Sequence, residues 1–305
     1  RLYDRSVRRQ MTFQAALKTT ANEIEALLDQ LLALKTSLAP RVTEAMRYSA
    51  LAQGKRLRPF FVSESARILG ADHHQALRVG AALECIHCYS LVHDDLPAMD
   101  DDALRRGKPT CHIAYDEATA ILAGDGLLTV AFEIIADPAT HADGAVRADL
   151  ALELARAAGH NGMVGGQMLD LAAEQIQSHD LDEIIAIQSL KTGALFRFSL
   201  EGGAILAQAG PADRTAMQTY ADKVGLAFQI ADDILDVESS PEQLGKATQK
   251  DADAGKATFI DLFGLDGARQ KASALADEAC DALAPYGDKA AILRDAARFI
   301  VERKN

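Results

Sequence analysis

Residues 84–110 read ECIHCYSLVHDDLPAMDDDALRRGKPT, an apolar run that ends in a cluster of acids followed by two arginines. Apolar residues recur with helical spacing through residues 73–95, which is typical of a long, nearly continuous helix. Pro97 then breaks that helix, because its ring removes a backbone donor and restricts the residue before it. The stretch therefore predicts a helix that delivers carboxylates to its C-terminal end.

Helical spacing also dominates the rest of the chain. It begins with the apolar repeat Leu17, Ile24, Leu27, Leu28, Leu31 and Leu32. Further helices are expected at 42–52, 59–69, 112–135, 145–158, 181–208, 212–238, 257–263, 267–283 and 287–303. Alternating Val- and Ile-rich runs are missing, so no sheet is expected. We expect an all-α protein in which residues 11–305 form one large domain and residues 1–10 are a tag or an extension.

Composition narrows the class of protein. The chain has 305 residues, 49% of them hydrophobic, no tryptophan and a formal net charge of -12. An acidic surface repels phosphate backbones, so no nucleic-acid partner is expected. No apolar run reaches the ~18 residues of a membrane span, and no signal-peptide core is present. A cytoplasmic protein is the simplest interpretation. The four cysteines, including the CxxC pair Cys85 and Cys88, are interpreted as small core residues rather than zinc ligands.

Two acidic clusters carry the strongest chemical signal. The first, DDLPAMDDD, begins at Asp94, and the bend after the helix lets Asp94 and Asp100 converge. The second, DDILD, begins at Asp232, and Asp236 lies four residues on, so both face the same way on a helix. Gathered carboxylates repel unless a cation lies between them. Oxygen ligands of this kind suit magnesium bridged to substrate phosphates. A solvated acidic loop is the alternative for either cluster alone; the apolar flanks of both favour a functional site.

Basic residues adjoin these acids and predict phosphate recognition, because guanidinium and ammonium groups are the usual diphosphate binders. LRRGKPT supplies Arg105 and Arg106, GKRLRP supplies Lys55 and Arg58, SLKTG supplies Lys191 beside Thr192, and the segment after DDILD supplies Lys246 and Lys256. His87 lies two helical turns before Asp94 on the same face. Ordinary surface salt bridges are the alternative. The sequence AGDGLL, which contains Gly124, Asp125 and Gly126, is interpreted as a hinge or a close-packing point, since no nucleotide-binding loop pattern is present.

These blocks, in this order, resemble the trans-isoprenyl diphosphate synthase family, and within it the bacterial farnesyl diphosphate synthases. The resemblance rests on GKRLRP, residues 84–110, ILAGDGLL, LKTG and FQIADDILD, and it extends from about residue 20 to the C-terminus. It implies an all-α isoprenoid-synthase fold around a deep central cavity, usually in a homodimer. One departure is Gln249 in LGKATQKD, where the family often has glycine. The gap between the first acid pair and Asp100 matches the bacterial subtype.

The resemblance also implies a role for each matched residue. Three magnesium ions (Mg2+), which manganese could replace, would be bound by Asp94, Asp100, Asp232 and Asp236, with Asp95, Asp101 and Asp233 in the outer shell. The allylic diphosphate would be held by Arg105, Lys191 and Lys256. Isopentenyl diphosphate would be held by Lys55, Arg58, His87 and Arg106. Thr192 and Gln229 would line the reacting centre.

The implied reaction is ionisation, condensation and elimination, with the released diphosphate as the base. Helix geometry predicts that product length would be set at Tyr89, five residues before Asp94 and so roughly 7.5 Å deeper along the helix; the alternative is that Tyr89 is simply a core residue. Beside the small Ser90, this bulky ring would stop growth at fifteen carbons. The alternatives are a geranyl or geranylgeranyl diphosphate synthase, a terpene cyclase, a non-catalytic helical partner subunit, and an HD-type metal phosphohydrolase suggested by His93 and Asp94.

Overall fold

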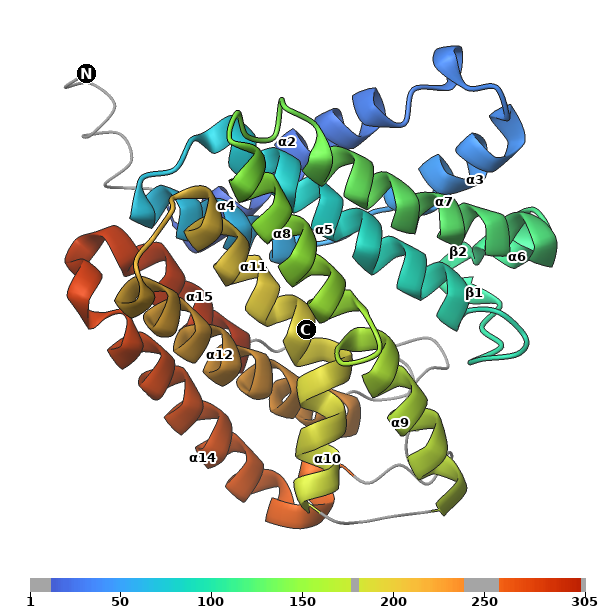
Figure 1. The fold of residues 1–305 in the computed structure, drawn as a ribbon. Helices are drawn as coiled ribbons and strands as arrows, with labels where there is room; N and C mark the ends of the chain where they lie inside the picture. The colour runs from blue at the N-terminus through green and yellow to red at the C-terminus, as the bar shows by residue number, and fades with distance from the viewer. Residues whose placement is uncertain (1–11, 177–180, 239–257, 303–305) are drawn as a thin grey trace. The chain divides into compact units, whose positions relative to one another are not determined.

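The structure, a computed structural model, describes residues 12–176, 181–238 and 258–302, and these are helical almost throughout (Figure 1). The first helices are α2 (Phe13–Leu31), η2 (Leu34–Thr36), α3 (Pro40–Ala50), α4 (Leu57–Leu69), α5 (His73–Asp94), α6 (Cys111–Ala114), α7 (Glu117–Ala136) and α8 (Gly144–Ala158). They are followed by α9 (Met163–Ile176), α10 (Leu181–Gln188), η3 (Ser189–Gly193), α11 (Ala194–Leu206), α12 (Pro211–Glu238), α14 (Phe259–Ala282), η4 (Ala284–Ala290) and α15 (Ala291–Glu302). The all-α prediction is confirmed. The one departure among the described residues is a short antiparallel ladder of two residues per strand, formed by β1 (Leu104–Arg105) and β2 (Lys108–Pro109).

The chain divides into two compact units, although the sequence predicts one domain. The N-terminal unit comprises Gln14–Leu152 with Ile205–Gln208, and the C-terminal unit comprises Glu153–Ala204 with Ala209 onward and the first residues up to Phe13. The first acidic cluster belongs to the N-terminal unit and the second to the C-terminal unit. The expectation that the two clusters meet across one cavity stays a prediction.

In the N-terminal unit, α5 is the central helix. It packs against α3, α4 and α7, and Figure 1 shows α5 and α7 running side by side. Residues around most of its circumference are buried, so it is a core helix rather than an amphipathic surface helix. Asp72 caps its start by accepting a hydrogen bond from the Gln75 N–H over 3.0 Å. A buried, capped α5 fixes where its acidic C-terminal end lies in this unit.

Helix α7 is the one helix among the described residues that is long and apolar enough to cross a membrane by length and composition, although acidic residues interrupt its apolar sequence. A buried core helix passes the same test, and 44% of its most apolar stretch is buried within the protein. Its packing against α5 accounts for that apolar face. Its length and composition are therefore weak grounds for a membrane span.

In the C-terminal unit, α12 packs against both α14 and α15 (Figure 1). The core of this contact includes Ile230 and Phe259, 0% and 2% exposed. Helix α14 begins with a capping box in which Thr258 and Asp261 satisfy each other's backbone N–H groups. It is interrupted at Gly264, whose φ of 65° favours glycine, and this break agrees with the two separate helices expected from sequence.

Two predicted helices are interrupted in the structure, and one observed helix was not predicted. The expected helix at 112–135 is broken, because Asp116 starts α7 by accepting the Thr119 N–H over 2.7 Å. The expected helix at 181–208 contains the π-helical turn η3. Helix α9 is absent from the prediction, because its two adjacent glycines, Gly165 and Gly166, lower helix propensity. Tertiary packing overrides that propensity here.

The cysteines are core residues, as the sequence predicts. Cys85, Cys88, Cys111 and Cys280 are all buried and none is in a disulfide. Burial raises the pKa of the Cys88 thiol to about 12, so it remains protonated at neutral pH.

Candidate active site

The first acidic cluster forms a tight loop at the C-terminal end of α5. The Asp100 N–H donates to the Asp94 carbonyl over 2.8 Å, and the Asp102 N–H donates to the Asp95 carbonyl over 3.2 Å. Asp101 adopts a φ of 51°, which helps the chain to reverse. The loop therefore brings the backbones of Asp94 and Asp100 together, as their spacing predicts. Metal binding by their side chains stays a prediction.

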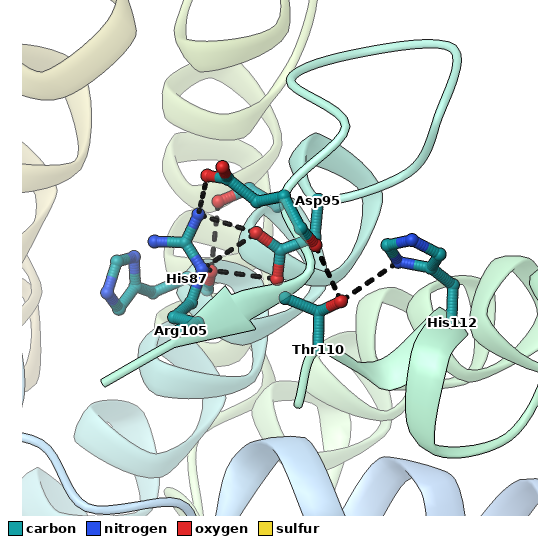
Figure 2. Close-up of polar contacts among 7 residues, drawn as sticks. His87, Asp95, Arg105, Thr110 and His112 are labelled. Atoms are coloured by element: carbon teal, nitrogen blue, oxygen red, sulfur yellow. Dashed lines mark hydrogen bonds and ion pairs between the residues drawn. The ribbon is translucent and has the colours of Figure 1, made fainter. Parts of the chain in front are cut away.

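Asp95 faces Arg105 (Figure 2). Nε and Nη2 of Arg105 donate to Asp95 Oδ1 over 2.8 and 2.6 Å. Asp95 is 3% exposed, and this burial raises the pKa of its carboxyl although the Arg105 guanidinium opposes the rise. Asp102 lies 3.8 Å from the same guanidinium. The sequence predicts Asp95 in the outer shell of a metal site; its direct partner in the structure is Arg105, which it orients.

The β1–β2 hairpin presents the second arginine. Arg106 and Gly107 both have positive φ, 52° and 75°, which is the pattern of a type I′ turn. The Arg106 guanidinium donates to the Gln53 carbonyl. A Cβ placed on Gly54 would lie 2.6 Å from Nη1 of Arg106, so the glycine of GKRLRP leaves room for this side chain. The GKRLRP and RRG blocks, far apart in sequence, are thus in contact.

A pocket of about 70 Å³ lies between α3, α5 and the hairpin in the N-terminal unit. Its ionisable lining includes the cations Arg56, Arg105, Arg106 and Lys108, the acids Glu84 and Asp95, and His87. Burial, and then the charges of Arg58 and Arg106, hold the pKa of His87 well below its usual value. His87 is therefore neutral in the ligand-free protein. A bound anion would offset the positive charge of the surrounding arginines and so raise the pKa of His87. The structure thus brings His87 and Arg106 together as predicted, with Arg58 nearby, whereas Lys55 is exposed outside this lining.

Arg56 and Glu84 form a buried pair that the sequence analysis missed. Nη1 of Arg56 lies 2.6 Å from Glu84 Oε1, and Nη2 donates to the carbonyls of Ala50 and Ala52 over 2.8 Å each. The pair ties the C-terminal end of α3 to the middle of α5. An acid inside the apolar run AALECI was the available signal, because a buried carboxylate requires a cation.

In the C-terminal unit, the SLKTG block forms the π-helical turn η3, and Lys191 and Thr192 lie within it. Lys191 Nζ lies 2.6 Å from Asp170 Oδ2 on α9. A Cβ on Gly166 would lie 2.2 Å from the Lys191 backbone nitrogen, so α9 approaches η3 at its glycine. The sequence analysis missed Asp170 together with its helix. Such π-turns are frequent at functional sites, which agrees with the predicted importance of Lys191.

The second acidic cluster lies on α12, a continuous helix, so Asp232 and Asp236 share a face as predicted. Asp233 accepts the Phe259 N–H over 2.8 Å and so helps to cap α14. Gln229, one turn before Asp233, is half-buried. The predicted binding residues Lys246 and Lys256, and the departure at Gln249, lie outside the described residues. The roles of Gln229, Thr192, Asp232 and Asp236 stay predictions.

Nothing in the described ranges forms a closed metal cage: no three histidine, cysteine or carboxylate side chains there gather closely enough to hold an ion. Magnesium usually binds through one or two carboxylates plus waters and substrate phosphates. The Asp94–Asp100 loop offers carboxylate oxygens, the hard donors that fit this ion. The residues present therefore suit magnesium bound together with a phosphorylated ligand.

Tyr89 forms part of the same helix end. It is 7% exposed, and burial followed by the charge of Asp94 raises the pKa of its phenol. The adjacent Ser90 donates its hydroxyl hydrogen bond back to the His87 carbonyl over 2.9 Å. A bulky ring near the Asp94 carboxylate is what the chain-length prediction requires.

Comparison with known proteins shows one consistent likeness. Residues 39–293 match the polyprenyl synthetase family. The chain is 42% identical to farnesyl diphosphate synthase of Escherichia coli, over 96% of this chain and 99% of that protein. It is also 42% identical to geranylgeranyl diphosphate synthase of Cyanophora paradoxa, over 87% and 88% of the two chains. A crystal structure described as an FPP/GFPP synthase from Zymomonas mobilis superposes with a TM-score of 0.86 at 46% identity, covering 95% of this chain and 98% of that one.

Proposed function

The chain belongs to the polyprenyl synthetase family, and from that premise we propose that it makes (2E,6E)-farnesyl diphosphate by joining isopentenyl diphosphate head-to-tail to dimethylallyl and then geranyl diphosphate. It is a prenyltransferase with the all-α isoprenoid-synthase fold, as the sequence predicts. Relatives of this similarity support prenyl chain elongation as its reaction class. The finer proposal concerns the substrates, the product and the residues.

The observation that carries the proposal is the arrangement at the end of α5. An aspartate loop, an arginine held by a buried carboxylate, and a histidine among arginines lie together in one unit. Oxygen ligands beside a cationic pocket suit two phosphorylated substrates, one bound through metal and one bound directly. A phosphohydrolase of the HD type would need several histidine ligands, and no such group exists among the described residues.

Magnesium-dependent chemistry is general in this family, and we propose three ions, replaceable by manganese, at Asp94, Asp100, Asp232 and Asp236. Asp95, Asp101 and Asp233 would support them. When bound, these ions neutralise charge that develops on the departing diphosphate. Asp95 would contribute indirectly, because it already holds Arg105 at 2.6 Å.

The protein's own cations then have two tasks. Arg105, Lys191 and Lys256 hold the allylic diphosphate while its carbon–oxygen bond breaks, so the developing charge meets fixed positive groups. Lys55, Arg58, Arg106 and His87 hold isopentenyl diphosphate so that its double bond faces the allylic carbon. The new carbon–carbon bond forms there, and the released diphosphate takes the proton lost from the adduct. Thr192 and Gln229 line this centre, and apolar walls exclude water from the cation.

We propose Tyr89 beside Ser90 as the floor that stops growth at fifteen carbons. The likeness to a geranylgeranyl diphosphate synthase makes a twenty-carbon product the specific competitor. Tyr89→Ala is expected to give twenty-carbon or longer products. An unchanged product spectrum in that variant would mean that Tyr89 is only a core residue.

We further propose a cytoplasmic homodimer whose partners are small diphosphates rather than nucleic acid. Its net charge of -12 disfavours binding to a phosphate backbone. Size-exclusion chromatography with light scattering tests the dimer; a monomeric mass at micromolar concentration would contradict it.

One assay tests the function directly. The purified chain is incubated with isopentenyl and dimethylallyl diphosphates, with and without magnesium, and the products are identified by chromatography. We expect farnesyl diphosphate only with a divalent metal. Asp94→Ala should reduce turnover sharply, and a near-normal rate in magnesium would refute its assigned role.

A further inference from the structure

The AGDG sequence of α7 contains two glycine notches that receive side chains from neighbouring helices. A Cβ on Gly124 would lie 2.1 Å from Nε2 of His93 on α5, and a Cβ on Gly126 would lie 2.7 Å from the Met46 sulfur on α3. At distances this short, the neighbouring side chain would have to shift to admit even a methyl group. The close-packing interpretation of AGDG is therefore correct, and it gives each glycine a specific occupant.

The occupant of the first notch, His93, also contacts Tyr89. The two rings lie edge to face, with centroids 5.8 Å apart and planes inclined by 78°. Nε2 of His93 lies 3.1 Å from the Ile121 carbonyl, which can only accept, so this nitrogen carries the proton. The imidazole is thus fixed on one side by α7 and touches the phenol ring on the other.

We propose that His93, seated in the notch at Gly124, is a positioning residue that supports the Tyr89 ring and thereby sets the chain length at which elongation stops. This inference rests on the proposed function, in which Tyr89 is the floor of the growing chain. A void beside the Tyr89 ring would let it change rotamer when a growing chain presses on it. His93 fills the space beside the ring, one helical turn along α5 toward Asp94, and Gly124 makes its position possible.

Substitutions at the two positions should act in opposite directions. His93→Ala leaves a void beside Tyr89, so products lengthen. Gly124→Ala places a methyl group where the imidazole stands and pushes the ring toward Tyr89, so products shorten toward ten carbons. In the double variant, the new methyl group occupies part of the vacated space, so the distribution returns toward the wild type.

The size of the shift can be bounded. One methylene in an apolar pocket changes discrimination by roughly tenfold or more. We expect His93→Ala to raise the ratio of twenty-carbon to fifteen-carbon product by about tenfold, since the group removed is larger than a methylene.

Met46→Ala is the matched control, because it empties the equivalent notch at Gly126. Met46 is buried like a core residue and contacts the same helix. This variant should lower the unfolding temperature while leaving product length unchanged. Chain length, unlike total activity, is a readout that a purely structural role of His93 would not move.

The experiment compares wild type, the three single variants and the double variant by product chromatography and thermal melting. Wild-type protein that forms no prenyl diphosphate overturns the proposed function itself. Wild-type protein that elongates, with His93→Ala and Gly124→Ala variants that both keep its product distribution, overturns only the inference about His93. If His93→Ala does not fold, Gly124→Ala tests the same contact from α7, and products that fail to shorten overturn the inference.

Discussion

The N-terminal unit contains two arginine–carboxylate pairs of equal length in different surroundings. In the buried pair, which we call the sealed pair, Arg56 and Glu84 are 2.6 Å apart, and their side chains are 1% and 5% exposed. In the pair at the hairpin, Arg105 and Asp95 are also 2.6 Å apart, but the arginine is 34% exposed beside an acid that is 5% exposed. The distance is the same and the accessibility of the cation differs. We infer that the buried cation stabilises the fold, whereas the accessible cation can also bind a ligand.

This contrast predicts different costs of disruption. Removing one partner of a sealed pair leaves the other charge buried where water cannot solvate it, which destabilises the folded protein. Removing the carboxylate of the accessible pair leaves a guanidinium that water can reach, so the loss falls on the geometry of the site. Stability should therefore report on the first pair, and turnover on the second.

The largest effect is expected at the sealed pair. Glu84→Ala should lower the free energy of unfolding by about 3–5 kcal/mol, because the buried Arg56 guanidinium loses its buried carboxylate partner. Urea denaturation measures this change. The matched control is Glu25→Ala, since Glu25 lies 3.7 Å from the same guanidinium but is 43% exposed. We expect the control to cost less than about 1 kcal/mol. Equal losses of unfolding free energy in the two variants would contradict the idea that burial makes the Arg56–Glu84 pair important for stability.

The accessible pair should show the opposite profile. Burial raises the pKa of Asp95 in the folded protein above its value in the unfolded chain. The free energy of unfolding therefore falls as pH rises through the range between these two pKa values, and the ionised carboxylate adds no stability at neutral pH. Asp95→Asn should thus leave the free energy of unfolding within about 1 kcal/mol of wild type. Turnover should fall by roughly 100-fold, because Arg105 loses its bidentate partner. Denaturation and steady-state kinetics are measured on the same preparation.

The control for this variant is Asp102→Asn. Asp102 lies 3.8 Å from the Arg105 guanidinium and is 26% exposed. Its loss should reduce turnover much less than the loss of Asp95. A large loss of stability with unchanged turnover in Asp95→Asn would place this pair in the same class as Arg56–Glu84.

His87 lines the same pocket as both pairs, and it should make the stability of the protein depend on pH. His87 has a folded-state pKa well below its usual value, first through burial and then through Arg58 and Arg106. The unfolded chain takes up a proton near pH 6.5 and the folded protein does not, so stability is lost as pH falls below about 6.5. His87→Gln should reduce that slope by at most about 1.4 kcal/mol per pH unit. Urea denaturation at about pH 7.5 and 5.5 measures it, and identical slopes would contradict the assignment.

These pairs also show what the sequence could and could not predict. Helical spacing placed α5 and α12 correctly, because their apolar positions are numerous and regular. The six-residue spacing from Asp94 to Asp100, interrupted by Pro97, predicted the approach of these two residues, since a short loop leaves little freedom. The partners of the cations were not predicted: Arg56 and Arg105 look alike in sequence, and only the fold shows which one is sealed.

Helix α9 was missed for a related reason. Its glycines reduce local propensity, and they are there because the backbone of η3 approaches within contact distance at Gly166. That approach depends on residues about twenty-five positions away, which no local pattern encodes. Asp170, the partner of Lys191, was missed along with the helix.

The smallest effect is expected at this third pair, Lys191–Asp170, in the C-terminal unit. Lys191 is 26% exposed and Asp170 13%, so the comparison places it with the accessible class. Asp170→Asn should change the free energy of unfolding by less than about 1 kcal/mol, because water can solvate the ammonium group. Turnover should fall by about threefold to tenfold, since an ammonium without its carboxylate is held less firmly toward the leaving group. Lys223 pairs with Glu278 at the surface of the same unit, with side chains 36% and 49% exposed, and Glu278→Gln provides the matched control. If both variants keep full turnover, accessibility of the cation does not identify functional pairs in this unit, and the distinction applies to α5 alone.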